Sequence, residues 1–249
     1  MKLNVARNGI TFGQNILDIE VPKQLRNKFK SGLDYIDSAL GGQGFTPSAV
    51  TFFTGEPGSG KTTMMLTLAD AITRAGGVCV FNTAEESLFQ VKLVVERLKF
   101  RNGFAVAQET HVPTLLKECD ALRAQNPGKP FLLIVDSLQC MDDGKYNDGH
   151  INSKSAERAL GMITDYCKEN YCNAMVIGQV SKSGQASGSN KLKHMVDAMM
   201  HLSVERKDKD LEGCRVLQTT KNRFGGCGHT FFLALDGKGF KEVARVSAA

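Results

Sequence analysis

The feature that most constrains this chain is a glycine-rich octapeptide at residues 55–62. It reads G-E-P-G-S-G-K-T and matches the G-x-x-x-x-G-K-[ST] phosphate-binding pattern in full. An apolar, β-rich run at 50–54 precedes it and a helical run at 63–75 follows, which argues against a chance match. In this context the glycines let backbone N–H groups face phosphates, at the positive end of the following helix. The sequence therefore predicts binding of a nucleoside triphosphate.

The positions within this loop have separate expected roles. We expect Lys61 to reach the β- and γ-phosphates and the Thr62 hydroxyl to ligate Mg²⁺. ATP and Mg²⁺ are thus the predicted cofactors. The residues expected to contact the nucleotide are Gly55, Glu56, Pro57, Gly58, Ser59, Gly60, Lys61, Thr62 and Thr63.

Short β-rich runs alternate with helical runs along the chain. This alternation predicts an α/β fold with a mainly parallel twisted sheet flanked by helices. After residue 197 the pattern changes to β-rich runs joined by short turns, which predicts a C-terminal antiparallel meander. The predicted parallel strands are 50–54, 78–83, 104–107, 131–136 and 174–180, and the three predicted meander strands are 198–204, 214–220 and 231–235. Residues 1–30 are polar, so we expect an N-terminal arm at 1–30, available for contacts between subunits, and a core at 31–249.

Composition narrows the class of protein. A length of 249 residues suits one large α/β unit, and the net charge of +5 permits a nucleic-acid partner without requiring one. The chain starts without an apolar leader, and no stretch approaches a membrane span, so we expect a cytoplasmic protein without membrane contact. The seven cysteines form no C-x-x-C pair and the five histidines show no metal-ligand spacing, so we interpret both sets as structural.

Two carboxylates are expected beside the loop. The run at 131–136 is a buried strand that ends in Asp136, which we expect to be the second element of the Mg²⁺ site. Other α/β proteins end strands in Asp for structural reasons, but the loop upstream favours the metal role. The strand at 78–83 leads into Glu85 and Glu86. We expect Glu85 to activate the attacking water and Glu86 to be a first-turn acid of the next helix, with helix capping by both as the alternative.

The segment 181–191 is small, polar and basic and has no apolar anchor. Such a composition predicts mobility when nothing is bound. Lysine and amide donors bind phosphates without reading sequence, so this segment suits contacts with a polyanion. On composition alone, however, a plain solvated surface loop is the better interpretation.

Taken together, these motifs resemble the RecA-like ATPases, and most closely the core of the bacterial RadA/Sms proteins of recombinational repair. The resemblance runs from about residue 31 to residue 243, and its most specific element is the pentapeptide K-N-R-F-G at 221–225, a hallmark of that family. Other matching segments are Gly32-Leu33-Asp34, Gly41-Gly42, the phosphate loop, Glu85-Glu86-Ser87, Ile134-Val135-Asp136-Ser137, Gly178–Gly188, His194-Met195-Val196-Asp197, Thr230-Phe231-Phe232-Leu233 and Gly237–Val243.

The resemblance implies a RecA-like ATPase core and assigns further roles. Gln179 would sense the γ-phosphate, and Lys221 and Arg223 would reach the nucleotide of the neighbouring subunit. It implies a homo-oligomer, a ring or a helical filament, with ATP at the subunit interfaces and single-stranded DNA as partner. The implied DNA-binding residues are Lys182, Ser183, Gly184, Gly188, Lys191 and Lys193.

The chain also departs from that family. RadA/Sms proteins normally carry an N-terminal four-cysteine zinc element and a C-terminal domain like that of Lon protease. Residues 1–30 contain no cysteine and the sequence ends at Ala249, so we expect a stand-alone core, as bacteriophages often encode.

The leading hypothesis is a Mg²⁺-dependent, DNA-stimulated ATPase that couples hydrolysis to strand exchange, annealing or branch migration. A replicative helicase motor of the DnaB type, which uses the same core, is the near alternative. A KaiC-like signalling ATPase without DNA is the alternative from another class. Against it stand the K-N-R-F-G pentapeptide and the basic loop.

Overall fold

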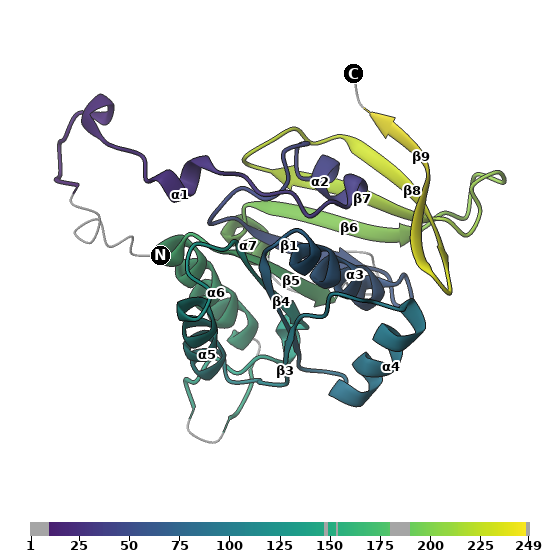
Figure 1. Ribbon diagram of the computed structural model, residues 1–249, viewed down its shortest axis with the longest axis horizontal. Helices are drawn as coiled ribbons and strands as arrows, with labels where there is room; N and C mark the ends of the chain where they lie inside the picture. Colours follow the sequence, from purple (N-terminus) through teal and green to yellow (C-terminus); the bar gives the residue numbers. More distant parts are fainter. Residues whose placement is uncertain (1–9, 147–148, 153, 180–189, 248–249) are drawn as a thin grey trace.

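The computed structural model describes residues 10–146, 149–152, 154–179 and 190–247, and Figure 1 shows their arrangement. Nine strands within these residues form one sheet, in the order β3-β2-β4-β5-β1-β6-β7-β8-β9. They are β1 (Val50–Gly55), β2 (Val78–Thr83), β3 (Ala105–Ala107), β4 (Phe131–Asp136), β5 (Asn173–Gln179), β6 (Ala198–Val204), β7 (Arg215–Asn222), β8 (His229–Asp236) and β9 (Gly239–Ser247).

The six strands from β3 to β6 in this order are paired in parallel. β1 lies between β5 and β6, at the centre of the whole sheet. Every residue of β1 and β4 is buried, because helices cover both faces of this part of the sheet. The helices are α1 (Lys23–Arg26), α2 (Asp34–Ala39), α3 (Lys61–Arg74), α4 (Leu88–Leu98), α5 (Val112–Ala124), α6 (Ser155–Asn170) and α7 (Asn190–Met195). The predicted α/β class is confirmed.

Neighbouring residues of β1 show how the sheet divides the apolar core. Phe53 packs in one cluster with Met64 and Leu68 of α3, and Phe52 packs in a second with Leu160 of α6. Successive side chains of a strand point to opposite faces, so these clusters fill the two sides of the sheet. Full burial of one such phenylalanine contributes about 1.5–3 kcal/mol to folding. Figure 1 shows α3 and α4 apart from α5 and α6, as two helical layers require.

The C-terminal antiparallel meander is also confirmed, but it has one strand more than predicted. β6, β7, β8 and β9 pair in sequence, whereas the chain after residue 197 predicted only three strands. β9 lies at the sheet edge, and charged residues such as Lys241, Glu242 and Arg245 interrupt its apolar positions. An edge strand buries few side chains, so its hydrophobic pattern is weak.

The residues before β1 divide into an exposed and an attached part. Phe12 and Leu17 are among the most exposed apolar side chains, and Figure 1 shows this segment extending away from the sheet. Phe29 forms a bridge with Phe45, and the Lys28 ammonium donates to the Phe224 carbonyl at 3.2 Å. The division at residue 30 stays a prediction. None of the helices in the described part of the chain combines the length and apolar character needed to cross a membrane.

Candidate active site

The phosphate loop joins β1 to α3 at the carboxyl edge of the parallel strands. Gly60 caps the start of α3 with a φ of +98°, a conformation that favours glycine. A Cβ there would also come within 2.9 Å of Leu235 and 3.1 Å of Phe240, both near the turn between β8 and β9. Two independent constraints therefore select glycine at this position. The loop directs the first turn of α3, and its positive dipole end, toward the same edge.

Lys61 folds back over this loop. Its ammonium donates to the carbonyls of Gly55 and Glu56, at 3.0 and 2.9 Å. Burial lowers the pKa of this ammonium, while the negative charges of Asp136 and Glu85 act in the opposite direction. The lysine thus lies where the sequence predicted a phosphate-facing cation, between the loop backbone and two carboxylates.

Thr62 meets Asp136 across the intervening strand β5. The Thr62 hydroxyl donates to Asp136 Oδ2 at 2.7 Å, although 74 positions separate the two residues. Burial raises the pKa of Asp136 to about 6; the nearby Glu85 and Glu86 add to this, and the Thr62 hydrogen bond and Lys61 oppose it. A hydroxyl beside a carboxylate is an oxygen donor set that Mg²⁺ accepts, and a dication would offset the buried negative charge. The residues present therefore fit a magnesium ion.

Glu85 reaches the same edge from the end of β2. Ser137, directly after Asp136, donates its hydroxyl to Glu85 Oε1, and the Cys140 thiol lies 3.7 Å from that oxygen. Because β2 pairs with β4 up to Thr83 and Asp136, these residues leave the sheet side by side. The structure thus brings together Lys61, Thr62, Asp136 and Glu85, as the sequence predicted.

The assignment of Glu86 to the first turn of the next helix is wrong. α4 begins at Leu88, and its first turn contains no acid. Ser87 caps the helix in a capping box with Gln90, which satisfies the first backbone donors without either glutamate. Glu86 instead forms a tight turn with Thr83, whose hydroxyl donates to its carbonyl at 2.7 Å.

Two arginines that the sequence did not predict contact the loop. Arg206 forms a bidentate ion pair with Glu56, at 2.6 and 3.1 Å, and this pair lowers the pKa of the Glu56 carboxyl. Arg215 Nε donates to the Ser59 carbonyl at 3.3 Å. Both arginines flank the turn between β6 and β7, about 150 positions from the loop. No local pattern in the sequence connects them with it.

The residues expected to sense phosphate and bind DNA are described only in part. The backbone of Gln179 ends β5 directly beside Gly55 of the loop. Lys191 forms an ion pair with Glu157 of α6, and the carbonyl of Lys193 is a hydrogen-bond acceptor. Lys182, Ser183, Gly184 and Gly188 lie outside the described residues.

Lys221 and Arg223 lie at the opposite edge of the sheet. Asn222 pairs with Ala198, the first residue of β6, and Ala198 pairs with Thr51 near the start of β1. This register places the end of β7 at the amino edge of the parallel strands, one strand length away from the phosphate loop. The structure therefore does not bring Lys221 and Arg223 to the chain's own nucleotide site.

The two basic side chains contact the end of α7 instead. The Lys221 ammonium donates to the carbonyls of Lys193 and Val196, at 2.8 and 2.7 Å. Arg223 pairs with the buried carboxylate of Asp197 at 3.3 Å, while half of its own side chain is exposed. Cations at a helix C-terminus are stabilising, so this arrangement has a structural role within one chain.

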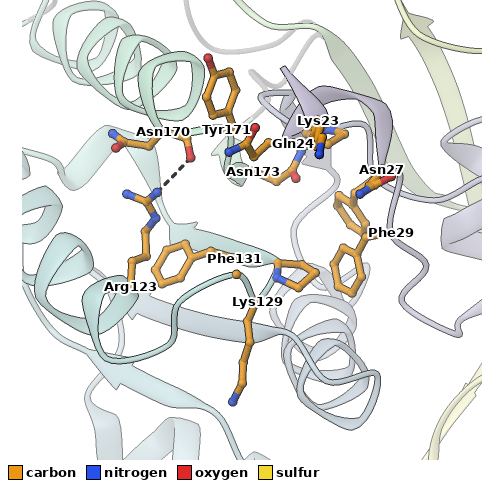
Figure 2. A pocket seen from close by; sticks show the side chains of 14 residues that line it. Lys23, Gln24, Asn27, Phe29, Arg123, Lys129, Phe131, Asn170, Tyr171 and Asn173 are labelled. Atoms are coloured by element: carbon orange, nitrogen blue, oxygen red, sulfur yellow. Dashed lines mark hydrogen bonds between the residues drawn. The ribbon is translucent and has the colours of Figure 1, made fainter. Parts of the chain in front are cut away.

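A pocket of about 500 Å³ also lies at the amino edge (Figure 2). Phe131 and Asn173, the first residues of β4 and β5, line it together with Lys23 of α1. Arg123 in its wall donates to the Asn170 carbonyl at 2.9 Å. Its position excludes this pocket as the site of the phosphate loop's nucleotide.

Two solved structures share this architecture. An ATPase domain matches with a TM-score of 0.75 at 15% sequence identity, over 87% of this chain and 91% of that one. A DnaB-like replicative helicase, solved in a study of its interactions with primase, matches with a TM-score of 0.70 at 15% identity, over 87% of this chain and 61% of that one. The chain therefore has the RecA-like ATPase fold.

Curated relatives make the assignment more specific. The DNA repair protein RadA of Aquifex aeolicus is 30% identical over 227 residues, which are 91% of this chain and 48% of that protein. RadA of Mycobacterium tuberculosis strain H37Rv is 30% identical over 217 residues, 86% of this chain and 43% of that protein. No family model matches the chain. The chain is RadA-like, which confirms the predicted resemblance, and it spans about half the length of the curated relatives it matches.

Proposed function

We propose that this chain is an ATP-hydrolysing protein of DNA recombination or repair. In this proposal it binds single-stranded DNA as a ring or filament of identical subunits. It couples hydrolysis to strand exchange, annealing or branch migration. The observation that carries the proposal is the meeting of Lys61, Thr62, Asp136 and Glu85 at one sheet edge, in a chain whose sequence is RadA-like.

The proposed chemistry follows from these four side chains. Lys61 turns from the loop carbonyls to the β- and γ-phosphates of ATP. Thr62 and Asp136 would hold Mg²⁺, which when bound would neutralise charge on the phosphates. Glu85 accepts a proton from the water that attacks the γ-phosphorus, because its carboxylate lies beside this site.

We propose an oligomer because Lys61 lies at the carboxyl edge of the sheet, whereas Lys221 and Arg223 lie at the amino edge. Lys221 and Arg223 are too far from the chain's own phosphate loop to contact its nucleotide. Head-to-tail packing of subunits would bring this edge against the next subunit's carboxyl edge. Such heterologous contacts form rings or helical filaments, depending on whether the rotation closes. ATP would then lie between subunits, so that hydrolysis changes the interface and the grip on DNA.

Stimulation of the ATPase rate by single-stranded DNA tests this proposal. Phosphate release is measured at saturating Mg²⁺ with and without a mixed-sequence oligonucleotide, with Glu85→Gln as the inactive control. We expect the oligonucleotide to raise the rate in the wild-type chain only. An equal rate with and without DNA would favour the KaiC-like alternative.

The DnaB-type motor is retained as a second candidate, because a DnaB-like helicase shares the fold over 87% of this chain. A forked duplex separates the two functions. A helicase motor unwinds it with one polarity in the presence of ATP. A recombination ATPase of the proposed type anneals or exchanges strands and leaves a simple fork largely intact.

A further inference from the structure

Two hydrogen-bond donors that the proposed chemistry does not require converge on Glu85. The Ser137 hydroxyl donates to Oε1, and the Cys140 thiol lies 3.7 Å from the same oxygen. Ser137 follows β4, and Cys140 ends the short 3-10 turn η3 (Leu138–Cys140). A single turn of chain thus presents both donors to a carboxylate that lies 52 positions before Ser137 and 55 before Cys140.

Ser137 is held more firmly than the carboxylate that it contacts. Ser137 is 1% exposed and Leu138, between the two donors, is fully buried, whereas Glu85 is an exposed residue. An exposed glutamate samples many rotamers, and ordering it costs conformational entropy. A hydroxyl fixed to the core is therefore suited to restrict it.

We propose that Ser137 and Cys140 are positioning residues, which hold the Glu85 carboxylate in the orientation that receives the proton of the attacking water. The inference rests on the proposed function, since both residues act through Glu85. Neither donates to ATP in this proposal. A hydroxyl is a stronger donor than a thiol, so Ser137 has the larger effect.

The electrostatic surroundings of Glu85 agree with the proposed role of Cys140 as a hydrogen-bond donor. Lys61 and Asp136 face the carboxylate from α3 and β4, and Glu86 is its neighbour in sequence. Burial and the negative charge of Glu85 raise the pKa of the Cys140 thiol, which keeps it protonated and able to donate. Cys140 therefore acts as a weak donor and not as a nucleophile.

The steady-state constants kcat and KM for ATP test the inference. Ser137→Ala should lower kcat roughly 10- to 100-fold, the loss of one hydrogen bond to a charged group, with KM within about twofold of wild type. Ser137→Thr keeps the hydroxyl and should recover most of this loss. Cys140→Val should lower kcat about two- to fivefold, and Cys140→Ser should perform better than Cys140→Val.

Two further variants separate positioning from packing. Ser137→Ala combined with Glu85→Gln should be no slower than Glu85→Gln alone, because residues that act as a unit are not additive. Ser155→Ala removes an equally buried hydroxyl at the start of α6, which accepts from Asn152 and Arg158, and should leave kcat per folded protein unchanged.

The outcomes distinguish this inference from the proposed function. If Glu85→Gln is inactive but Ser137→Ala keeps wild-type kcat, the positioning role is overturned and the proposed function stands. Equal losses in Ser137→Ala and Ser137→Thr assign the effect to packing and also overturn it. An inactive wild-type chain, or an active Glu85→Gln, overturns both. If Ser137→Ala does not fold, the comparison of Cys140→Val with Cys140→Ser tests the inference. Equal kcat values for these two variants would overturn the positioning role.

Discussion

The two edges of the sheet use their charged residues differently. At the carboxyl edge, residues from the ends of β1, β2 and β4 converge, and Lys61, Asp136 and Glu85 face one another. At the amino edge, Lys221 and Arg223 contact carbonyls of α7 and the buried Asp197. The first group gathers a cation and two carboxylates from three separate segments at one point of the edge. The second consists of two cations from one strand end, and their contacts are with the end of α7 and the residues that follow it.

This difference indicates which part of the proposed active site a single chain can supply. Parallel strands bring their carboxyl ends to one edge, so a site can be assembled there from distant parts of the sequence. The meander brings the end of β7 back to the other edge, where its basic residues stabilise the C-terminus of α7. The nucleotide site is therefore expected to belong mainly to one chain, and the role of the basic pair in catalysis is expected to require a second chain.

Loss of the loop lysine should give the largest effect. Lys61→Ala removes the cation held between Gly55, Glu56 and the carboxylates, so we expect ATP turnover to be abolished. Phosphate release measures this. Lys92→Ala, which removes an exposed lysine paired with Glu96, is the matched control and should keep the wild-type rate. Substantial turnover by Lys61→Ala would show that the carboxyl edge does not hold the catalytic site.

Replacement of Arg223 at the amino edge should give the second-largest loss of ATP hydrolysis. We expect Arg223→Ala to bind ATP but to hydrolyse it slowly, since a transition-state arginine contributes roughly 10³–10⁵ in rate. Arg223→Lys keeps a charge near the buried Asp197, and should preserve the fold while losing the forked donor geometry.

A mixing experiment then tests whether Arg223 acts on the neighbour. Arg223→Ala and Glu85→Gln each damage a different half of a shared site, so mixed oligomers would contain some intact interfaces. Activity should reappear on mixing. Its absence in oligomers shown to contain both variants would mean that Arg223 serves only its own subunit or the fold.

The carboxyl edge was predictable because its residues have local patterns. The phosphate loop is a contiguous motif, and Asp136 ends a continuous apolar strand. The contacts of Arg206 and Arg215 with the loop depend on the register of β6 and β7, which no single segment encodes. Ser137 was matched to a motif, but its hydrogen bond to Glu85 depends on β2 and β4 being neighbours.

The amino edge was less predictable for a related reason. The resemblance to RadA/Sms proteins points to the basic pair Lys221 and Arg223, but its contacts with α7 depend on how the meander returns across the sheet. β9 is not predicted because an edge strand interrupted by charged residues buries too little to show a clear pattern. In both cases long-range pairing, rather than local propensity, determines the structure.

A smaller effect concerns stability at the carboxyl edge. Burial raises the pKa of Asp136 from 3.8 to about 6, so the folded state binds this proton more tightly than the unfolded state does. Its contribution to stability is present below pH 4 and is lost as the pH rises through about 6. Asp136→Asn should therefore stabilise the nucleotide-free chain at pH 8, on the order of 2–3 kcal/mol, while abolishing turnover.

Thermal unfolding at two pH values measures that effect. The gain in Tm should be several degrees at pH 8 and smaller at pH 4.5, because folded Asp136 is then largely protonated and the pH lies within one unit of the unfolded pKa of 3.8. Asp208→Asn, on an exposed turn, is the matched control and should change Tm little at either pH. A gain that is independent of pH would mean that packing, not charge burial, limits stability there.

The smallest effect is expected in DNA binding near the amino edge. Lys191 and Lys193 belong to α7, whose end is held by the basic pair, and Lys182 lies outside the described residues. Replacing all three by alanine should weaken binding of single-stranded DNA without changing its low sequence preference. Each lost phosphate contact should reduce the log–log salt dependence by about 0.7.

Titration of a labelled oligonucleotide at several salt concentrations gives this slope. Lys92→Ala with Lys117→Ala removes charge from α4 and α5 and should leave the slope unchanged. Lys191 is paired with Glu157, so its contribution to DNA binding competes with an existing ion pair and should be the weakest of the three. An unchanged slope in the triple variant would move the DNA site away from α7, with the basic residues at 23–30 as the next candidates. In that case only the proposed subunit interface, and not bound DNA, would connect the amino edge with the nucleotide site.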